Sequence, residues 1–103
     1  MVLIVFRIRL AVDLLAAEYE RTGSRMVELV SCMPGFVGMD YAQVEDGELL
    51  VVRFESHEAL EAWRNHPEHL EAQRRGKQEF FESYQIEVCE LVRSYGPSYG
   101  LVA

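Results

Sequence analysis

Phe54-Glu-Ser-His-Glu-Ala-Leu-Glu-Ala-Trp-Arg-Asn-His-Pro-Glu-His69 is the stretch that decides the fold, because it contains the only Trp and all three His of the chain. Ser56 is a typical N-cap residue, which predicts that a strand gives way to a helix at this point. Pro67 cannot continue that helix undisturbed but is well tolerated on the first turn of a new one. The sequence therefore predicts a helix break just before His69, with Trp63 pointing inward from the first helix.

The composition is typical of one soluble domain. The chain has 103 residues, and 50% of them are hydrophobic, which is enough for a core and argues against disorder. Because 17 Asp and Glu outnumber 10 Lys and Arg, a nucleic-acid surface is not expected. The apolar run at residues 2–6 is too short for a membrane span and is followed by Arg7 and Arg9. We expect a cytoplasmic protein that binds neither nucleic acid nor a membrane.

The apolar periodicity outside the quoted stretch predicts strands and helices in alternation. The expected elements are a strand at 2–9, an amphipathic helix at 13–33, strands at 36–45 and 48–54, a helical region at 56–75, a short turn or helix at 77–83, and a last strand at 84–93. Asp46-Gly47 is a strong hairpin signal between the two middle strands. The tail at 94–103 is expected to form an extended arm beyond a single domain whose core is 2–93.

This order of elements predicts a ferredoxin-like α+β fold, βαββαβ, with a four-stranded antiparallel sheet and both main helices on one face. The first strand is apolar on both sides near its start, so the uncovered face of the sheet would expose a large apolar patch. We therefore expect two sheets to pack face to face in a homodimer, with the aromatic tail reaching across as an arm.

The two cysteines, Cys32 and Cys89, lie in different expected elements and lack the C-x-x-C spacing of a redox or zinc motif. We expect both to be buried thiols, with a disulfide or a catalytic thiolate as the alternatives.

Four local motifs together resemble the antibiotic biosynthesis monooxygenase (ABM) family within the dimeric α/β-barrel superfamily. They are Met33-Pro-Gly-Phe36, Phe54-Glu-Ser56, Trp63 followed by His66-Pro-Glu-His69, and Phe80-Phe-Glu-Ser-Tyr84. The resemblance covers residues 2–93 and implies a pocket between the helices and the sheet. It also implies oxygenation of a small aromatic, phenolic or quinol substrate by dioxygen with no metal or flavin cofactor.

Such a reaction needs a base, a dry cavity for a planar ring and donors to a developing oxyanion. His69 and His66 are the candidate bases, since a histidine pKa starts near neutrality. The candidates for substrate binding are Trp63, Phe80 and Phe81 as stacking partners, and Asn65, Tyr41, Tyr84 and Arg53 as donors. The structural alternatives are that Trp63 anchors the core, that His66 caps a helix and that His69 makes an ordinary hydrogen bond near the helix start.

Three other interpretations compete with cofactor-free oxygenation. A metal held by His66, His69 and a nearby Glu is disfavoured, because Pro67 spoils the helical face that would bring the ligands together. Haem-degrading relatives of the family combine an Asn on the first strand with a downstream His that ligates iron. In this chain Phe6 and Gln73 fall at or near those positions. A non-catalytic ligand-binding barrel is the third possibility. The acidic residues around the break are expected to form a solvated helix face, and His57 is also expected to be solvated. These acidic residues are Glu58, Glu61, Glu68 and Glu71.

Overall fold

A computed structural model describes residues 1–13 and 15–97 of the chain. The elements are β1 (Val2–Leu10), α1 (Ala16–Ser31), β2 (Phe36–Val44), β3 (Gly47–Phe54), α2 (His57–Arg64), α3 (Pro67–Arg75), the π-helical turn η1 (Gly76–Phe80) and β4 (Phe81–Glu90). Their order follows the expected one, and the helical region is divided at Pro67 as predicted.

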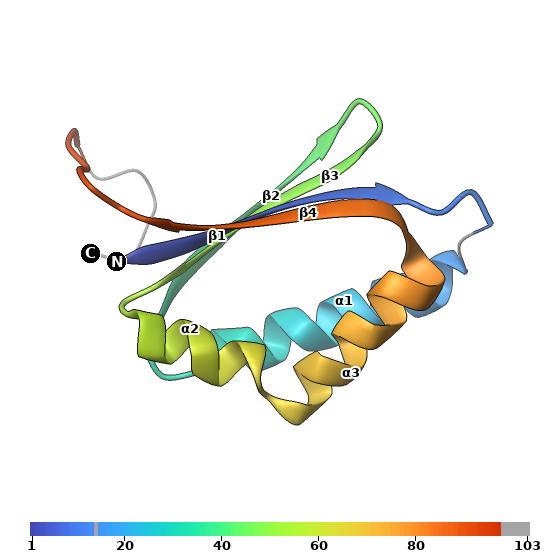
Figure 1. The fold of residues 1–103 in the computed structure, drawn as a ribbon, viewed down its shortest axis with the longest axis horizontal. Coiled ribbons are helices and arrows are strands. Elements are labelled where there is room, and N and C mark those ends of the chain that lie inside the picture. Colours follow the sequence, from blue (N-terminus) through green and yellow to red (C-terminus); the bar gives the residue numbers. More distant parts are fainter. Residues whose placement is uncertain (14, 98–103) are drawn as a thin grey trace.

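The four strands form one antiparallel sheet in the order β2-β3-β1-β4. Figure 1 shows α1, α2 and α3 in a layer on one side of the sheet, while the other side carries no helix. The predicted ferredoxin-like fold is therefore confirmed. The sheet is open, with β2 and β4 as its edges, so a single chain does not close a barrel.

The strand register separates the two faces of the sheet. Val2 pairs with Phe54, and Ile4 pairs with Val52 on β3 and with Val88 on β4. Directly opposed residues point to the same side, so these even-numbered positions of β1 and their partners form the helix face. The odd-numbered positions of β1 and their partners form the open face.

The hydrophobic core lies between the helix layer and one end of this helix face. Its buried members are Val2, Val30, Val52, Phe54, Leu60 and Trp63. The N-cap prediction for α2 is confirmed, because the Ser56 hydroxyl accepts a hydrogen bond from the backbone N–H of Ala59 at 3.2 Å. This cap fixes where α2 begins and directs Leu60 and Trp63 into the core.

The hairpin between β2 and β3 turns at Asp46-Gly47, as predicted. Gly47 is required there by a close backbone approach, because a Cβ atom at this position would lie 1.9 Å from the carbonyl oxygen of Ile8. The turn therefore seats the hairpin directly against β1 and brings Glu48 onto the helix face opposite Ile8.

The bounds of most elements differ from the predictions by one or two residues, and the first helix and the last strand, with the short turn before it, differ by more. The first helix begins at Ala16 instead of residue 13, after Leu15, which caps it without a side-chain hydrogen bond and is 63% exposed. The last strand begins at Phe81 and ends at Glu90, so Val92 lies beyond it. Residues 94–97 form no strand or helix, and the rest of the predicted arm, 98–103, lies outside the described residues.

No helix within residues 1–13 and 15–97 combines the length and the apolar character needed to cross a bilayer.

Candidate functional site

The junction between α2 and α3 positions both histidines of the helix break. His66 lies between the helices as the N-cap of α3, and its Nδ1 accepts a hydrogen bond from the backbone N–H of Glu68 at 3.2 Å. The capping interpretation of His66 is therefore confirmed. Pro67 follows as the first residue of α3, where its missing N–H costs no helical hydrogen bond.

Trp63 is buried, with 4% of its surface exposed, so its predicted inward orientation is confirmed. His69 stacks on the indole, with ring centroids 4.1 Å apart and an angle of 14° between the planes. His66 lies further away, at 5.9 Å and tilted by 45°. Trp63 is thus a core residue that also supports the His69 ring.

Hydrogen bonding decides which nitrogen of His69 carries the proton. Nδ1 lies 3.0 Å from the carbonyl oxygen of Trp63. A carbonyl oxygen only accepts, so Nδ1 donates and Nε2 of the neutral ring keeps its lone pair. Nε2 has no partner among the described residues. Among the described residues, no fully buried side-chain nitrogen or oxygen lacks a partner, so Nε2 retains some exposure to solvent.

The surroundings favour the neutral form of this ring. Burial lowers the pKa of His69 below its usual value, and the hydrogen bond to the Trp63 carbonyl opposes this effect without overcoming it. The charge that His66 can carry lowers the pKa of His69 further. At neutral pH His69 is therefore an uncharged imidazole with an accessible acceptor nitrogen, which is the state a general base requires.

The helix face is incompletely covered along β4. Tyr84, Ile86 and Val88 pair with Ile8, Phe6 and Ile4 of β1 and so point to the helix side. Their exposed fractions are nevertheless 43%, 49% and 54%. We call these three residues the β4 stripe. It is an apolar surface on the same side of the sheet as Trp63 and His69.

An aromatic cluster adjoins one end of the β4 stripe. Phe6 lies edge-on to Phe81 and to Tyr84, with centroids 5.6 and 6.4 Å apart. Gly76 permits this packing, because a Cβ atom there would lie 2.4 Å from the Phe81 ring. Two of the residues predicted to bind substrate, Phe81 and Tyr84, are therefore brought together.

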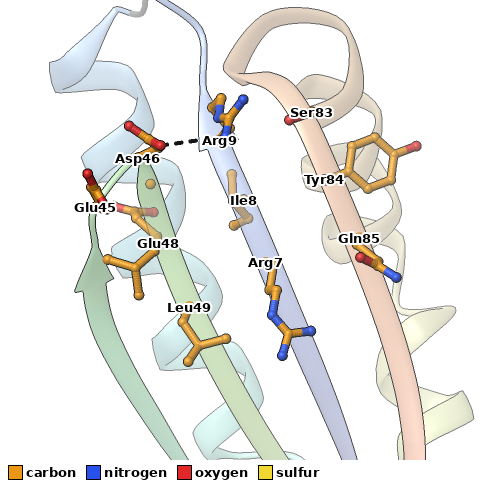
Figure 2. A pocket seen from close by; sticks show the side chains of 12 residues that line it. Arg7, Ile8, Arg9, Glu45, Asp46, Glu48, Leu49, Ser83, Tyr84 and Gln85 are labelled. Atoms are coloured by element: carbon orange, nitrogen blue, oxygen red, sulfur yellow. Dashed lines mark ion pairs between the residues drawn. The ribbon is translucent and has the colours of Figure 1, made fainter.

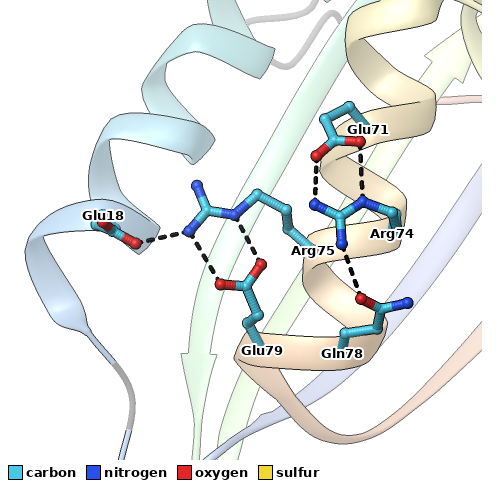
Figure 3. Close-up of polar contacts among 6 residues, drawn as sticks. All are labelled: Glu18, Glu71, Arg74, Arg75, Gln78 and Glu79. Atoms are coloured by element: carbon cyan, nitrogen blue, oxygen red, sulfur yellow. Dashed lines mark hydrogen bonds and ion pairs between the residues drawn. The ribbon is translucent and has the colours of Figure 1, made fainter.

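Phe80 is placed in a different environment. Its ring lies edge-on to Tyr19, and the Arg75 guanidinium lies 4.8 Å from the ring centroid. Figure 3 shows that Arg75 also bridges Glu18 of α1 and Glu79 of η1. Phe80 thus belongs to a junction that holds the end of α3 against α1.

Three other predicted donors are engaged with groups other than His69 and Trp63. Arg53 points to the open face, where it pairs with Asp40 at 2.7 Å. The exposed Asn65 donates its amide to the Glu61 carbonyl at 2.9 Å and closes the end of α2. The third donor, Tyr41, lies on the edge strand β2 and binds a buried carboxylate, described next.

Glu48 is the buried carboxylate, with 7% of its surface exposed. The Tyr41 hydroxyl donates to its Oε2 at 2.6 Å, and the Tyr19 hydroxyl donates to its Oε1. The hydrogen bond to Glu48 raises the pKa of Tyr41, and burial followed by the hydrogen bond to Glu48 strongly raises the pKa of Tyr19. Both phenols therefore stay protonated and donate to this carboxylate. The hydroxyl of Tyr41 is then not available to donate to a substrate oxyanion.

A hollow of about 580 Å³ lies at the hairpin end of the open face. Figure 2 shows Arg7, Leu49 and Gln85 around it with the helices behind the sheet, and an ion pair between Arg9 and Asp46. This hollow is on the opposite side of the sheet from the pocket that the resemblance implied.

The expected burial of the two thiols is wrong, because Cys32 and Cys89 are both exposed. Cys32 caps the end of α1, and Cys89 lies on the edge strand β4 opposite Leu3, on the open face. Neither position is covered by another element. Within the described ranges, no three His, Cys, Asp or Glu side chains are grouped to hold a metal ion.

Comparison with known proteins identifies the family. The model of the antibiotic biosynthesis monooxygenase family matches residues 1–75. The chain belongs to this family. It is also 36% identical over 76 residues to the uncharacterized protein YqjZ of Bacillus subtilis, a match that spans 73% of this chain and 67% of YqjZ.

Solved structures of ABM-like proteins share the fold. SnoaB from Streptomyces nogalater, a cofactor-independent oxygenase, superimposes with a TM-score of 0.75 at 17% identity, over 94% of this chain and 97% of SnoaB. A dimeric ferredoxin-like protein of unknown function from Thermobifida fusca gives a TM-score of 0.71 at 11% identity, over 87% and 90% of the two chains. At these identities the similarity concerns the fold.

The hydrogen bonds of Tyr19 and Tyr41 to Glu48 predict how the stability of the fold changes in alkaline solution. The pKa of Tyr19 is raised in the folded state, whereas an unfolded tyrosine ionises near pH 10. The folded state therefore loses stability as the pH rises above about 10, by at most about 1.4 kcal/mol per pH unit from this group. Tyr19→Phe should cost about 1–3 kcal/mol at pH 7 and then lose less stability than the wild type between pH 10 and 11.

Urea unfolding at pH 7, 10 and 11 measures this difference, with Tyr95→Phe as the matched control because Tyr95 is 86% exposed. Parallel losses in wild type, Tyr19→Phe and Tyr95→Phe would contradict the assignment.

Proposed function

We propose that this ABM-family protein is a monooxygenase that oxidises a small aromatic, phenolic or quinol substrate with dioxygen and without a cofactor. Family membership supports oxygenase chemistry, and the fold shared with the cofactor-independent oxygenase SnoaB supports the cofactor-free form. The observation that carries the proposal is His69, a neutral imidazole stacked on Trp63 with an accessible Nε2.

In the proposed reaction, Nε2 of His69 removes a proton from the hydroxyl or activated C–H group of the substrate. The resulting electron-rich anion forms a C–O bond to dioxygen. The C–H bond of that carbon and the O–O bond then break, so that one oxygen stays in the substrate as a carbonyl and the other leaves as water, which carries away that hydrogen and the proton held by His69. The substrate supplies all four electrons. The Trp63 carbonyl assists by accepting from Nδ1, because this hydrogen bond stabilises the imidazolium that forms. The base can then be regenerated by returning its proton to the leaving oxygen.

We propose that the substrate lies on the β4 stripe, with its ring against the cluster of Phe6, Phe81 and Tyr84. Apolar side chains that stay exposed in a folded domain are typical of a ligand surface. The Tyr84 hydroxyl is a candidate donor to the substrate anion. Trp63 packs against one face of the His69 ring. Arg53, Asn65, Tyr41, Phe80 and His66 are left out of the proposed site because their side chains are engaged elsewhere.

Haem chemistry is not proposed. Phe6 belongs to the aromatic cluster and supplies no amide, and Gln73 supplies no imidazole at the expected ligand position. A Soret shift on addition of haem that disappears in His69→Gln would favour that alternative.

The test of the proposed function is oxygen uptake with a hydroquinone or an anthrone in the presence of a metal chelator. Loss of a general base typically costs about 10²–10⁴-fold in rate, so His69→Gln should lose at least about 100-fold of the enzymatic uptake. His57→Gln is the matched control, because His57 is exposed and binds only Glu90. An unchanged rate in His69→Gln, or ligand binding by the wild type without oxygen uptake, would contradict the proposal.

We also propose that the functional unit is a homodimer formed through the open face. This face exposes a contiguous apolar band of Leu3, Val5, Ala42, Val44, Leu49 and Val51. The ion pairs Arg7–Glu87 and Asp40–Arg53 lie on either side of the band, as polar groups do at the rim of an interface. The ferredoxin-like protein of Thermobifida fusca that shares the fold is described as dimeric, which supports a dimer.

Sedimentation equilibrium tests the dimer. The wild type should sediment at twice the 11.9 kDa mass of one chain, and Val51→Arg should sediment as a single chain because it buries an unpaired charge in the band. Val27→Arg is the control, since Val27 lies exposed on α1. A compact single chain in dilute wild type would contradict the proposed interface.

A further inference from the structure

Gln73 of α3 makes two contacts that the proposed reaction does not use. Its Nε2 donates to the carbonyl oxygen of Arg64, the last residue of α2, at 2.9 Å, and lies 3.3 Å from Nδ1 of His69. The side chain is half-buried, one turn beyond His69 on the same helix. Gln73 therefore connects the end of α2 to the candidate base across the break at Pro67.

Side chains of α3 donate hydrogen bonds to the last backbone carbonyls of α2. The last carbonyls of a helix have no partner within it. Here the Trp63 carbonyl accepts from the backbone N–H of His66 and from Nδ1 of His69, and the Arg64 carbonyl accepts from Gln73. The amide of Gln73 is thereby fixed in orientation, because its nitrogen must face the Arg64 carbonyl.

This orientation places a donor against a donor. The N–H groups of Gln73 lie beside Nδ1, which already carries the proton donated to Trp63. A neutral imidazole tolerates that contact, whereas an imidazolium would bring a full positive charge against the positive end of the amide dipole. The amide of Gln73 thus makes protonation of Nε2, which would give the imidazolium, less favourable.

Other groups near His69 do not offset this effect. His66 adds to it when charged, and Glu68, which precedes His69, is held by two hydrogen bonds of 3.0 Å from Arg25 of α1. From β4, Tyr84 and Glu90 are the ionisable residues at helix-face positions, and Glu90 pairs with His57 at 2.9 Å. Among the described residues, no carboxylate forms a hydrogen bond or ion pair with His69.

We infer that Gln73 is a positioning residue that holds its amide donor against Nδ1 and so keeps the His69 imidazole neutral, with Nε2 open to substrate. The inference rests on the proposed function for its catalytic meaning, but the state of the ring can be measured without substrate.

The experiment follows the His69 ring by NMR of protein labelled with ¹⁵N-histidine, in wild type, Gln73→Met and Gln73→Glu. Gln73→Met keeps the side-chain length and removes the donor, so the pKa of His69 should rise by up to about 1 unit. Gln73→Glu replaces the donor with a carboxylate and should raise it by about 1–3 units. Gln78→Met is the matched control and should leave the titration of His69 unchanged, since Gln78 is exposed and accepts only from Arg74.

An unchanged or lowered pKa of His69 in Gln73→Met would overturn the inference, and the same result in Gln73→Glu would do so if the Met variant fails to fold. Where oxygen uptake is measurable, the acid limb of the kcat profile should move to higher pH in Gln73→Met. Absence of uptake with the predicted order of pKa values would refute the proposed function and leave the role of Gln73 intact.

Discussion

The stacking of His69 on Trp63 is the contact on which the candidate site depends. Trp63 is held in the core by Val2, Phe54 and their neighbours, so its ring and its carbonyl are fixed in place. The ring supports one face of the imidazole and the carbonyl accepts from Nδ1. One buried residue therefore sets both the orientation and the tautomer of the candidate base, and this leaves only Nε2 for chemistry.

Pro67 makes this arrangement possible. An uninterrupted helix would satisfy the carbonyls of Trp63 and Arg64 with backbone N–H groups four residues later. The break leaves them without those partners at the end of α2, and side chains of α3 take their place. Nδ1 of His69, on the first turn of α3, thus meets the carboxyl end of α2, where the dipole of that helix favours a proton on Nδ1. Burial works in the opposite direction and keeps the ring neutral.

The fold and the helix break were predictable because they depend on local signals. Ser56, the Asp46-Gly47 turn and Pro67 each act within a few residues of the chain, and each behaves as predicted. The partners of polar side chains were not predictable in this way. Tyr41 was expected to serve a substrate, but it binds Glu48 together with Tyr19 of α1, a residue 29 positions from Glu48. The exposure of Cys89 likewise follows from strand order, because β4 is an edge strand.

The fluorescence of Trp63, the only tryptophan in the chain, tests this account most directly. An imidazolium stacked on an indole quenches its emission, whereas a neutral imidazole does so much less. A pH titration of the wild type should show quenching with a midpoint below the usual histidine pKa of about 6.5, and His69→Gln should abolish that transition. A midpoint at or above that value, or a transition that persists in His69→Gln, would contradict the account of a neutral base held by Trp63.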